Sequence, residues 1–293
     1  MQAVAEKVIA RAKELLASGE VQRVLGWEKG EFDYERTPAL FEQGNIDKLV
    51  YDKFCAANLS KKLVEVSKLE GKTLALIKPC DSLSLNQLLC EHRVKRENIY
   101  VLGVGCKGME GKDGLCMKCE FCKGKNFAIS DEVIDDESCR EVPQSDRFAA
   151  VRELEEKTPE ERYAFWRSEL SKCIRCNACR NVCPACTCIK CVFDNPDSGV
   201  SSKANTDTFE ENQFHIIRAF HVAGRCTDCG ECSRVCPQHI PLHLLNRKFI
   251  KDTNGLYGAY QAGADLDSRP PLMDFRKDDC EPSVVYERGG AKG

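Results

Sequence analysis

Two short apolar segments stand out in the first half of the chain. Thr73–Ile77 and Ile99–Val104 contain almost no polar residues, which is typical of strands covered on both faces. Between them, Ser82–His92 places leucines at helical spacing, as the amphipathic segment Ala3–Leu16 does with its apolar residues. A strand, a helix and a second strand joined by short loops predict a parallel α/β unit.

The second half of the chain shows helical patterns instead. Thr158-Pro159-Glu160-Glu161 combines a hydroxyl cap, a proline at the first helical position and acids in the first turn, which predicts a helix start. Phe214–Val222 and Pro241–Lys251 are further helix candidates. The patterns divide the chain into an α/β N-terminal domain at residues 1–140, a helical linker at 141–170, a mainly α-helical domain at 171–250 and an extended tail at 251–293.

Cysteine content changes the picture, because the 293 residues include 20 cysteines. Disulfide frameworks belong to small secreted chains. This chain is large, and its first residues lack the apolar run of a signal peptide. We therefore expect a cytoplasmic protein whose thiolates bind metal. No apolar run is long enough to span a membrane, and a net charge of −3 gives no reason to expect nucleic-acid binding.

The strongest motif is C-x2-C-x2-C-x3-C-P, which occurs twice and is typical of bacterial ferredoxins with two [4Fe–4S] clusters. In that pattern the fourth cysteine of each run binds the other cluster. The alternative is zinc, for which paired C-x2-C units suffice. The expected fold is thus an α/β domain plus a mainly α-helical two-[4Fe–4S] ferredoxin-like domain. The predicted ligands are Cys173, Cys176, Cys179 and Cys236 for cluster 1, and Cys226, Cys229, Cys232 and Cys183 for cluster 2.

A second set of cysteines follows the two apolar strands. Cys80 comes after the first strand and Cys106 after the second, and parallel α/β folds place their sites at such strand ends. With Cys119 and Cys122 from the next loop they could bind a third [4Fe–4S] cluster, in which Cys116 could replace one ligand. A zinc site or unliganded thiols are the alternatives.

Three cysteines, Cys186, Cys188 and Cys191, follow the first ferredoxin-like run. They could bind a further cluster, they could bridge to a neighbouring metal centre, or they could be buried thiols packed on cluster 1. A separate motif, Gly103-x-Gly105-x-x-Gly108, lies at the end of the second apolar strand and matches the glycine pattern of a dinucleotide-binding fingerprint. That motif needs a helix directly after it, and the glycine-rich sequence that follows favours a ligand loop instead.

Several short segments of the chain carry a family resemblance: Val21-x-x-Val24-Leu25-Gly26-Trp27, Lys78-Pro79-Cys80-Asp81, Val101–Cys106 with Gly108, Cys119-x-x-Cys122, Asn212–His215, Arg218–Cys226 and Ile240-Pro241-Leu242. The N-terminal segments resemble the beta subunits of deazaflavin-reducing hydrogenases and formate dehydrogenases. The C-terminal half looks like the two-cluster domain of heterodisulfide reductase C subunits.

The resemblance implies an iron–sulfur electron-transfer subunit of a redox complex. Its implied partners are a flavin-containing heterodisulfide reductase-like subunit and hydrogenase or formate dehydrogenase subunits. The family's beta subunits bind FAD and have a longer flavin region, whereas only about 140 residues precede the linker here. We therefore expect a non-catalytic relay; the alternative is an FAD-containing subunit that itself reduces a deazaflavin or nicotinamide coenzyme.

Overall fold

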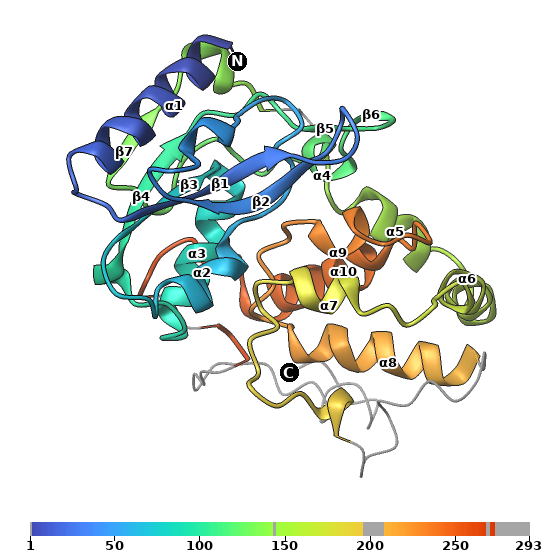
Figure 1. Ribbon diagram of the computed structural model, residues 1–293. Helices are drawn as coiled ribbons and strands as arrows, with labels where there is room; N and C mark the ends of the chain where they lie inside the picture. The colour runs from blue at the N-terminus through green and yellow to red at the C-terminus, as the bar shows by residue number, and fades with distance from the viewer. Residues whose placement is uncertain (1, 143–144, 196–207, 268–269, 273–293) are drawn as a thin grey trace.

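A mixed five-stranded sheet forms the N-terminal part of the molecule (Figure 1). The computed structural model describes residues 2–142, 145–195, 208–267 and 270–272. Strands β1, β3, β4 and β7 run parallel to one another, and the edge strand β2 is antiparallel to β1. In sheet order the strands are β2 (Arg36–Phe41), β1 (Arg23–Lys29), β3 (Thr73–Ile77), β4 (Ile99–Val104) and β7 (Glu132–Ile134).

Helices cover both faces of this sheet. Helix α1 (Gln2–Ala17) lies on one face, and α2 (Ser60–Val66) and α3 (Pro79–Cys90) lie on the other (Figure 1). Burial on both faces explains why β3 and β4 are apolar along their whole length. The parallel pairing of β3 with β4, joined through α3, confirms the predicted α/β unit.

One local prediction was wrong. The leucine pattern predicted a helix that starts at Ser82, but α3 begins at Pro79. Proline is favoured at the first helical position because it needs no hydrogen-bond partner there and its φ angle already suits a helix. Cys80 therefore lies in the first turn of α3, directly after the end of β3.

The rest of the described chain is helical, with one small hairpin in the loop after β4. That hairpin stands where a dinucleotide fingerprint would need a helix. The remaining elements are η1 (Ile46–Lys48), η2 (Arg96–Asn98), β5 (Glu110–Gly111), β6 (Gly114–Leu115), α4 (Met117–Glu120), η3 (Glu137–Cys139), α5 (Ala149–Glu155), α6 (Pro159–Ser171), α7 (Ala178–Val182), η4 (Val192–Asp194), α8 (Thr208–His221), α9 (Glu231–Arg234) and α10 (Leu242–Tyr257).

Helix boundaries in this half follow local sequence signals. Thr158 caps α6 in a full capping box with Glu161, as the sequence predicted. Helix α10 continues to Tyr257, past the boundary expected at residue 250. Lys251 is held in the helix by its ion pair with Glu155 of α5, 2.8 Å away. Residues 268–269 and 273–293 of the expected tail lie outside the described residues.

The two halves of the molecule meet through buried polar contacts. Lys118 and Glu231 form an ion pair of 2.6 Å in which both side chains are almost completely buried. The hydroxyls of Ser84 and Thr227 lie 2.9 Å apart across the same boundary. Buried polar groups need matched partners, so these contacts define how the halves fit together. Among the described residues, no helix has the length and apolar character that crossing a membrane requires.

Candidate metal centres

The four N-terminal cysteines line one cavity, which we call cavity A. Cys80, Cys106, Cys119 and Cys122 surround a space of about 30 Å³. Cys80 and Cys106 arrive from the carboxyl ends of neighbouring parallel strands, and the other two come from α4 and the residues after it. Cys116 does not line this cavity among the described residues. The grouping expected from strand order is therefore present.

Backbone amides point at the sulfurs of cavity A. The amide of Gly108 donates to Cys106 Sγ at 3.3 Å, and that of Met109 donates to Cys119 Sγ at 3.2 Å. Gly108 has a φ of +120°, a conformation that glycine adopts without strain. Amide hydrogen bonds of this kind stabilise negative charge on sulfur and tune the potential of a bound cluster.

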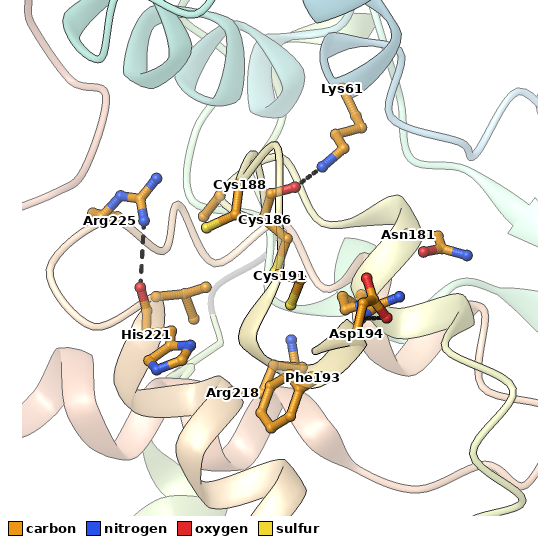
Figure 2. A pocket seen from close by; sticks show the side chains of 13 residues that line it. Lys61, Asn181, Cys186, Cys188, Cys191, Phe193, Asp194, Arg218, His221 and Arg225 are labelled. Atoms are coloured by element: carbon orange, nitrogen blue, oxygen red, sulfur yellow. Dashed lines mark hydrogen bonds and ion pairs between the residues drawn. The ribbon is translucent and has the colours of Figure 1, made fainter. Parts of the chain in front are cut away.

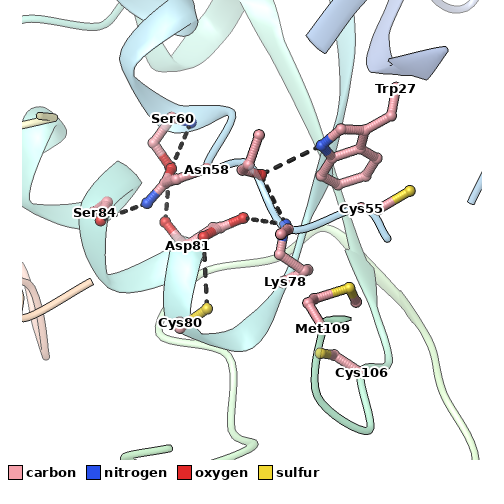
Figure 3. Close-up of polar contacts among 12 residues, drawn as sticks. Trp27, Cys55, Asn58, Ser60, Lys78, Cys80, Asp81, Ser84, Cys106 and Met109 are labelled. Carbon is pink, nitrogen blue, oxygen red and sulfur yellow. Dashed lines mark hydrogen bonds and ion pairs between the residues drawn. The ribbon is translucent and has the colours of Figure 1, made fainter. Parts of the chain in front are cut away.

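A buried network surrounds the first turn of α3, which carries Cys80 (Figure 3). Lys78 is fully buried, and its Nζ lies 2.8 Å from an Asp81 carboxylate oxygen and 2.9 Å from the Ala57 carbonyl oxygen. The same Nζ lies 4.2 Å from the centre of the Trp27 ring, a cation–π contact. This network fixes the first turn of α3.

The two ferredoxin-like runs have the same backbone conformation. The residue two after each first cysteine is left-handed, with φ of +52° at Arg175 and +53° at Asp228. The amides of these residues donate to Cys173 Sγ at 3.3 Å and to Cys226 Sγ at 3.4 Å. Asn177 and Gly230 are left-handed as well. Successive amides turned inward in this way form an anion-binding concavity.

The dicluster quartets come together as the spacing predicted. Cys173, Cys176, Cys179 and Cys236 line a cavity of about 20 Å³, which we call cavity B. The other quartet is also clustered, because Cys183 lies near enough to raise the pKa of each of the Cys226, Cys229 and Cys232 thiols, on which burial has the largest effect. The fourth cysteine of each run therefore lies beside the other run.

The three quartets lie in a row. Cys229 lines cavity A together with the N-terminal cysteines, so the middle quartet adjoins that cavity. Cys179 of cavity B interacts with Cys232 of the middle quartet. The order through the molecule is cavity A, then the middle quartet, then cavity B.

Arg218 lies between the last two quartets. Its side chain is almost completely buried, and its three nitrogens have no hydrogen-bond partner within the described residues. Burial disfavours its charge, but Cys232, Cys179, Cys183 and Cys186 face it and raise its pKa above the ordinary value. A buried cation without a partner costs several kcal/mol, so its surroundings fit an anionic group.

The chemistry of the thiols also fits iron–sulfur clusters. Burial raises the pKa of the Cys173 thiol to about 12 and that of Cys179 to about 11. Such thiols lose their protons at neutral pH when a metal cation binds them. Clusters held by four thiolates would be anionic and would give Arg218 the counter-charge that it lacks.

Sulfur spacing separates these quartets from zinc sites. Four thiolates around one zinc at 2.3 Å lie about 3.8 Å apart. Within the described residues, the one group with three ligand atoms within 4.8 Å of each other is Cys173, Glu211 and His215. None of the cysteine quartets is gathered that tightly, which suits a cube with one thiolate at each corner.

The remaining candidates lie elsewhere. Cys186, Cys188 and Cys191 line a separate cavity of about 600 Å³ (Figure 2). Cys116 packs against the core of the N-terminal half. Three lysines of the glycine-rich loop turn inward: Lys118 pairs with Glu231, Lys123 donates to the Asp228 carbonyl and Lys125 donates to the Cys106 carbonyl.

Sequence reasoning missed the charged and polar residues around the quartets. Arg218, Glu231 and His215 are all buried, and His215 lines cavity B. Each lies near a cysteine motif in the sequence, but nothing in the spacing says which way its side chain points. Charged residues are seldom fully buried without a partner, so the sequence alone favoured exposure.

Comparisons with known proteins find a two-cluster iron–sulfur domain in the second half of the chain. Residues 169–240 match the family described as the 4Fe-4S dicluster domain. The chain is 22% identical to the F420-dependent formate dehydrogenase subunit beta of Methanocaldococcus jannaschii, over 92% of this chain and 94% of that protein. It is 24% identical to the F420-dependent formate dehydrogenase 1 subunit beta of Methanococcus maripaludis, over 91% and 92%.

The alignment with the first of these relatives spans 366 positions, more than the 293 residues of the chain. That relative therefore contains segments with no counterpart here. The resemblance inferred from the sequence is confirmed: this is an iron–sulfur protein with a 4Fe–4S dicluster domain, similar over most of its length to formate dehydrogenase beta subunits.

Proposed function

We propose that the chain relays electrons through three [4Fe–4S] clusters, as a non-catalytic subunit of a formate dehydrogenase-type or hydrogenase-type complex. Cavity A would hold one cluster with Cys80, Cys106, Cys119 and Cys122. The middle quartet would hold the second with Cys183, Cys226, Cys229 and Cys232. Cavity B would hold the third with Cys173, Cys176, Cys179 and Cys236. The clusters supply one-electron transfer when bound.

The single observation that carries this proposal is the row of quartets. Cys229 lines cavity A, and Cys179 faces Cys232, so each cluster would have its neighbour on the far side of one layer of side chains. The residues of the chain orient the thiolates, exclude water and compensate charge. Arg218 compensates charge between the middle quartet and cavity B. The Lys118–Glu231 pair has this role between cavity A and the middle quartet.

The ends of the row would meet different partners. By resemblance, a formate dehydrogenase or hydrogenase subunit stands at one end and a flavin-containing heterodisulfide reductase-like subunit at the other. The two relatives are both named as formate dehydrogenase subunits, which favours the first kind of partner.

Iron and sulfide analysis of anaerobically purified chain tests the proposal. We expect at least about twelve irons per chain, since each cube holds four. Replacing Cys80, Cys176 or Cys229 with alanine should each remove about four irons. The matched control is Cys55→Ala, which changes a buried cysteine that lines none of the cavities. Zinc in place of iron, or variants that keep all their iron, would refute the proposal.

One observation favours a second function. A groove of about 820 Å³ adjoins cavity A, shares Cys80 and Cys122 with it, and is lined by Phe121 and Phe148. A flavin ring in this groove would let the chain reduce a coenzyme directly. Acid extraction would then release about one FAD per chain, and the purified chain would reduce a deazaflavin or nicotinamide coenzyme. The extra segments of the longer relative favour the relay instead.

A further inference from the structure

The dicluster half contains a cavity of about 600 Å³, which we call the basic cavity (Figure 2). It is lined by Cys186, Cys188 and Cys191 together with Arg180, Arg218 and Arg225. Three thiols within six residues, on a loop whose backbone leads from the fourth cysteine of the first run into η4, all reach one space. Neither the ferredoxin-like motif nor the relay of three clusters uses them.

Each of the three thiols faces a cation. Cys186 faces Arg218 and Lys61, Cys188 faces Arg225, and Cys191 faces Arg180. Lys61 also donates to the Cys186 carbonyl, so α2 of the N-terminal half is tied to this loop. Arg180 and Arg225 have carboxylate partners, Asp194 at 2.8 Å and Glu91 at 2.7 Å. Arg218 has none among the described residues.

The surroundings do not suit thiols that serve as apolar packing. Cys188 is exposed, and apolar packing needs burial. The arginines would be poorly placed beside neutral thiols, whereas they match a group of negative charge. Nor are the three sulfurs gathered as zinc requires, because they are absent from the one compact ligand group found among the described residues.

We propose that Cys186, Cys188 and Cys191 bind a further [4Fe–4S] cluster in the basic cavity. Its fourth iron would face the cavity and take a ligand other than cysteine. The cavity is larger than a cube needs, which leaves room for that ligand. The inference extends the proposed relay, because the Cys186 backbone amide donates to the carbonyl of Cys183, a member of the middle quartet, at 3.1 Å. The further cluster would branch from the row of three clusters and would reach the protein surface at Cys188, which is exposed.

The test compares the wild-type chain with a variant carrying Cys186→Ala, Cys188→Ala and Cys191→Ala, all purified without oxygen. We expect about sixteen irons and sixteen sulfides in the wild type, and a loss of about four of each in the variant. Cys90→Ala is the control, because Cys90 lines none of the three cysteine cavities, and it should lose none. Equal iron in variant and wild type would overturn the inference, as would the loss of one zinc instead of iron.

Two single variants distinguish a failure of this inference from a failure of the proposed relay. The single variant Cys188→Ala changes an exposed side chain, so its fold should be intact by circular dichroism while the same four irons are lost. Cys176→Ala removes a different four, those of cavity B. A chain whose Cys176→Ala variant keeps its iron refutes the relay, whereas a chain in which only the Cys188→Ala variant keeps its iron refutes the fourth cluster alone.

Discussion

Arg218 shows how one side chain can serve two redox centres. It is buried between the middle quartet and cavity B, and no described residue offers it a hydrogen-bond acceptor. A cation in this position favours the more negative, reduced state of any cluster beside it. It should therefore raise the reduction potentials of both neighbouring clusters.

Replacing this charge should lower those potentials. At an effective dielectric constant of 20 and a separation of about 8 Å, one charge is worth about 2 kcal/mol, or about 90 mV for one electron. We expect Arg218→Gln to lower two of the midpoint potentials by up to that amount, as measured by a redox titration followed by electron paramagnetic resonance. Arg218→Lys should restore most of the shift, and Arg152→Gln, an exposed arginine, should leave every potential unchanged. Unaltered potentials in Arg218→Gln would contradict this role.

Glu231 makes the opposite arrangement, a buried anion between two cations. Its carboxylate lies 2.6 Å from Lys118 Nζ and 2.7 Å from Arg234, and it accepts the Asn58 amide at 3.2 Å. Burial alone would raise its pKa, but Lys118 and Arg234 hold the pKa of Glu231 well below its usual range. Its charge therefore stabilises the folded state at neutral pH.

The pH dependence follows from this direction. A carboxyl whose pKa is lower when folded stabilises the fold fully above its unfolded pKa of about 4.3, and that stability is lost as pH falls towards the folded pKa. Glu231→Gln should cost about 3–5 kcal/mol at pH 7, because it leaves the buried Lys118 ammonium without its anion. The gap between its thermal unfolding midpoint and that of the wild type should narrow below about pH 4.3. Glu153→Gln, at an exposed position, should show no gap at any pH.

At the scale of elements, the β3–α3 junction places Cys80. Lys78 ends the strand side of the junction, and Asp81 lies in the first turn of α3. Both are fully buried and paired at 2.8 Å. The pair therefore supports the first turn of α3, which places Cys80 at cavity A. Neither side chain is proposed to touch a cluster.

Breaking the pair should affect both stability and iron content. Lys78→Met leaves a buried carboxylate without its cation, at a cost of about 3–5 kcal/mol. We expect a lower thermal midpoint and a loss of about four irons, those of cavity A. In the double variant Lys78→Met/Asp81→Asn the stranded charge is gone, so part of the stability should return. Lys62→Met, at an exposed position on α2, is the control; a Lys78→Met chain with full iron and an unchanged midpoint would argue against the supporting role.

Sequence alone predicted those elements whose signals are local. The bounds of β3 and β4 follow from apolar runs, and the start of α6 follows from Thr158 and Pro159. The cysteine groupings followed from spacing and from strand order. The edge strand β2 was missed because Pro38 and its polar neighbours lack a strand pattern, which an edge position tolerates.

What the sequence could not give is the direction of side chains that meet across long separations. Lys118 and Glu231 are 113 residues apart, and each reads as a surface residue in its own segment. The burial of Arg218 likewise depends on two cysteine runs folding around it. Such contacts arise when whole elements pack against one another. No periodic pattern in the sequence therefore predicts them.

At the scale of the whole molecule, the segment after α10 returns to the N-terminal half. Gly263 has a φ of +75°, and its carbonyl accepts the Asn86 side-chain amide at 3.0 Å. A Cβ atom at Gly263 would lie 1.9 Å from the Leu83 carbonyl oxygen. The chain therefore contacts α3 where only glycine fits.

Two glycine substitutions should have opposite effects on stability. Gly263→Ala combines a left-handed backbone with a clash and should cost more than about 1 kcal/mol, which lowers the thermal midpoint by roughly 2–4 °C or more. Gly255→Ala is the matched control, because Gly255 lies in α10 with open space around its Cα. It should be neutral or stabilising by up to about 1 kcal/mol. Equal midpoints for both variants would show that the segment is not held against α3.

The order of the quartets gives the last prediction. Reduced clusters that are neighbours broaden each other's paramagnetic signals, and the effect fades with distance. In a chain whose Cys186, Cys188 and Cys191 are replaced by alanine, only the three quartets remain. Adding Cys80→Ala should remove an end cluster and keep the coupling between the other two.

Adding Cys229→Ala instead should remove the middle cluster and leave two uncoupled signals, because among the described residues cavity A and cavity B share no lining residue, whereas the middle quartet adjoins both. Both variants should hold the same amount of iron, about eight per chain, so iron loss cannot explain a difference between them. Coupling that survives in the Cys229→Ala chain and disappears in the Cys80→Ala chain would place cavity A in the middle. The relay would then run in another order than the contacts of Cys229 and Cys179 indicate.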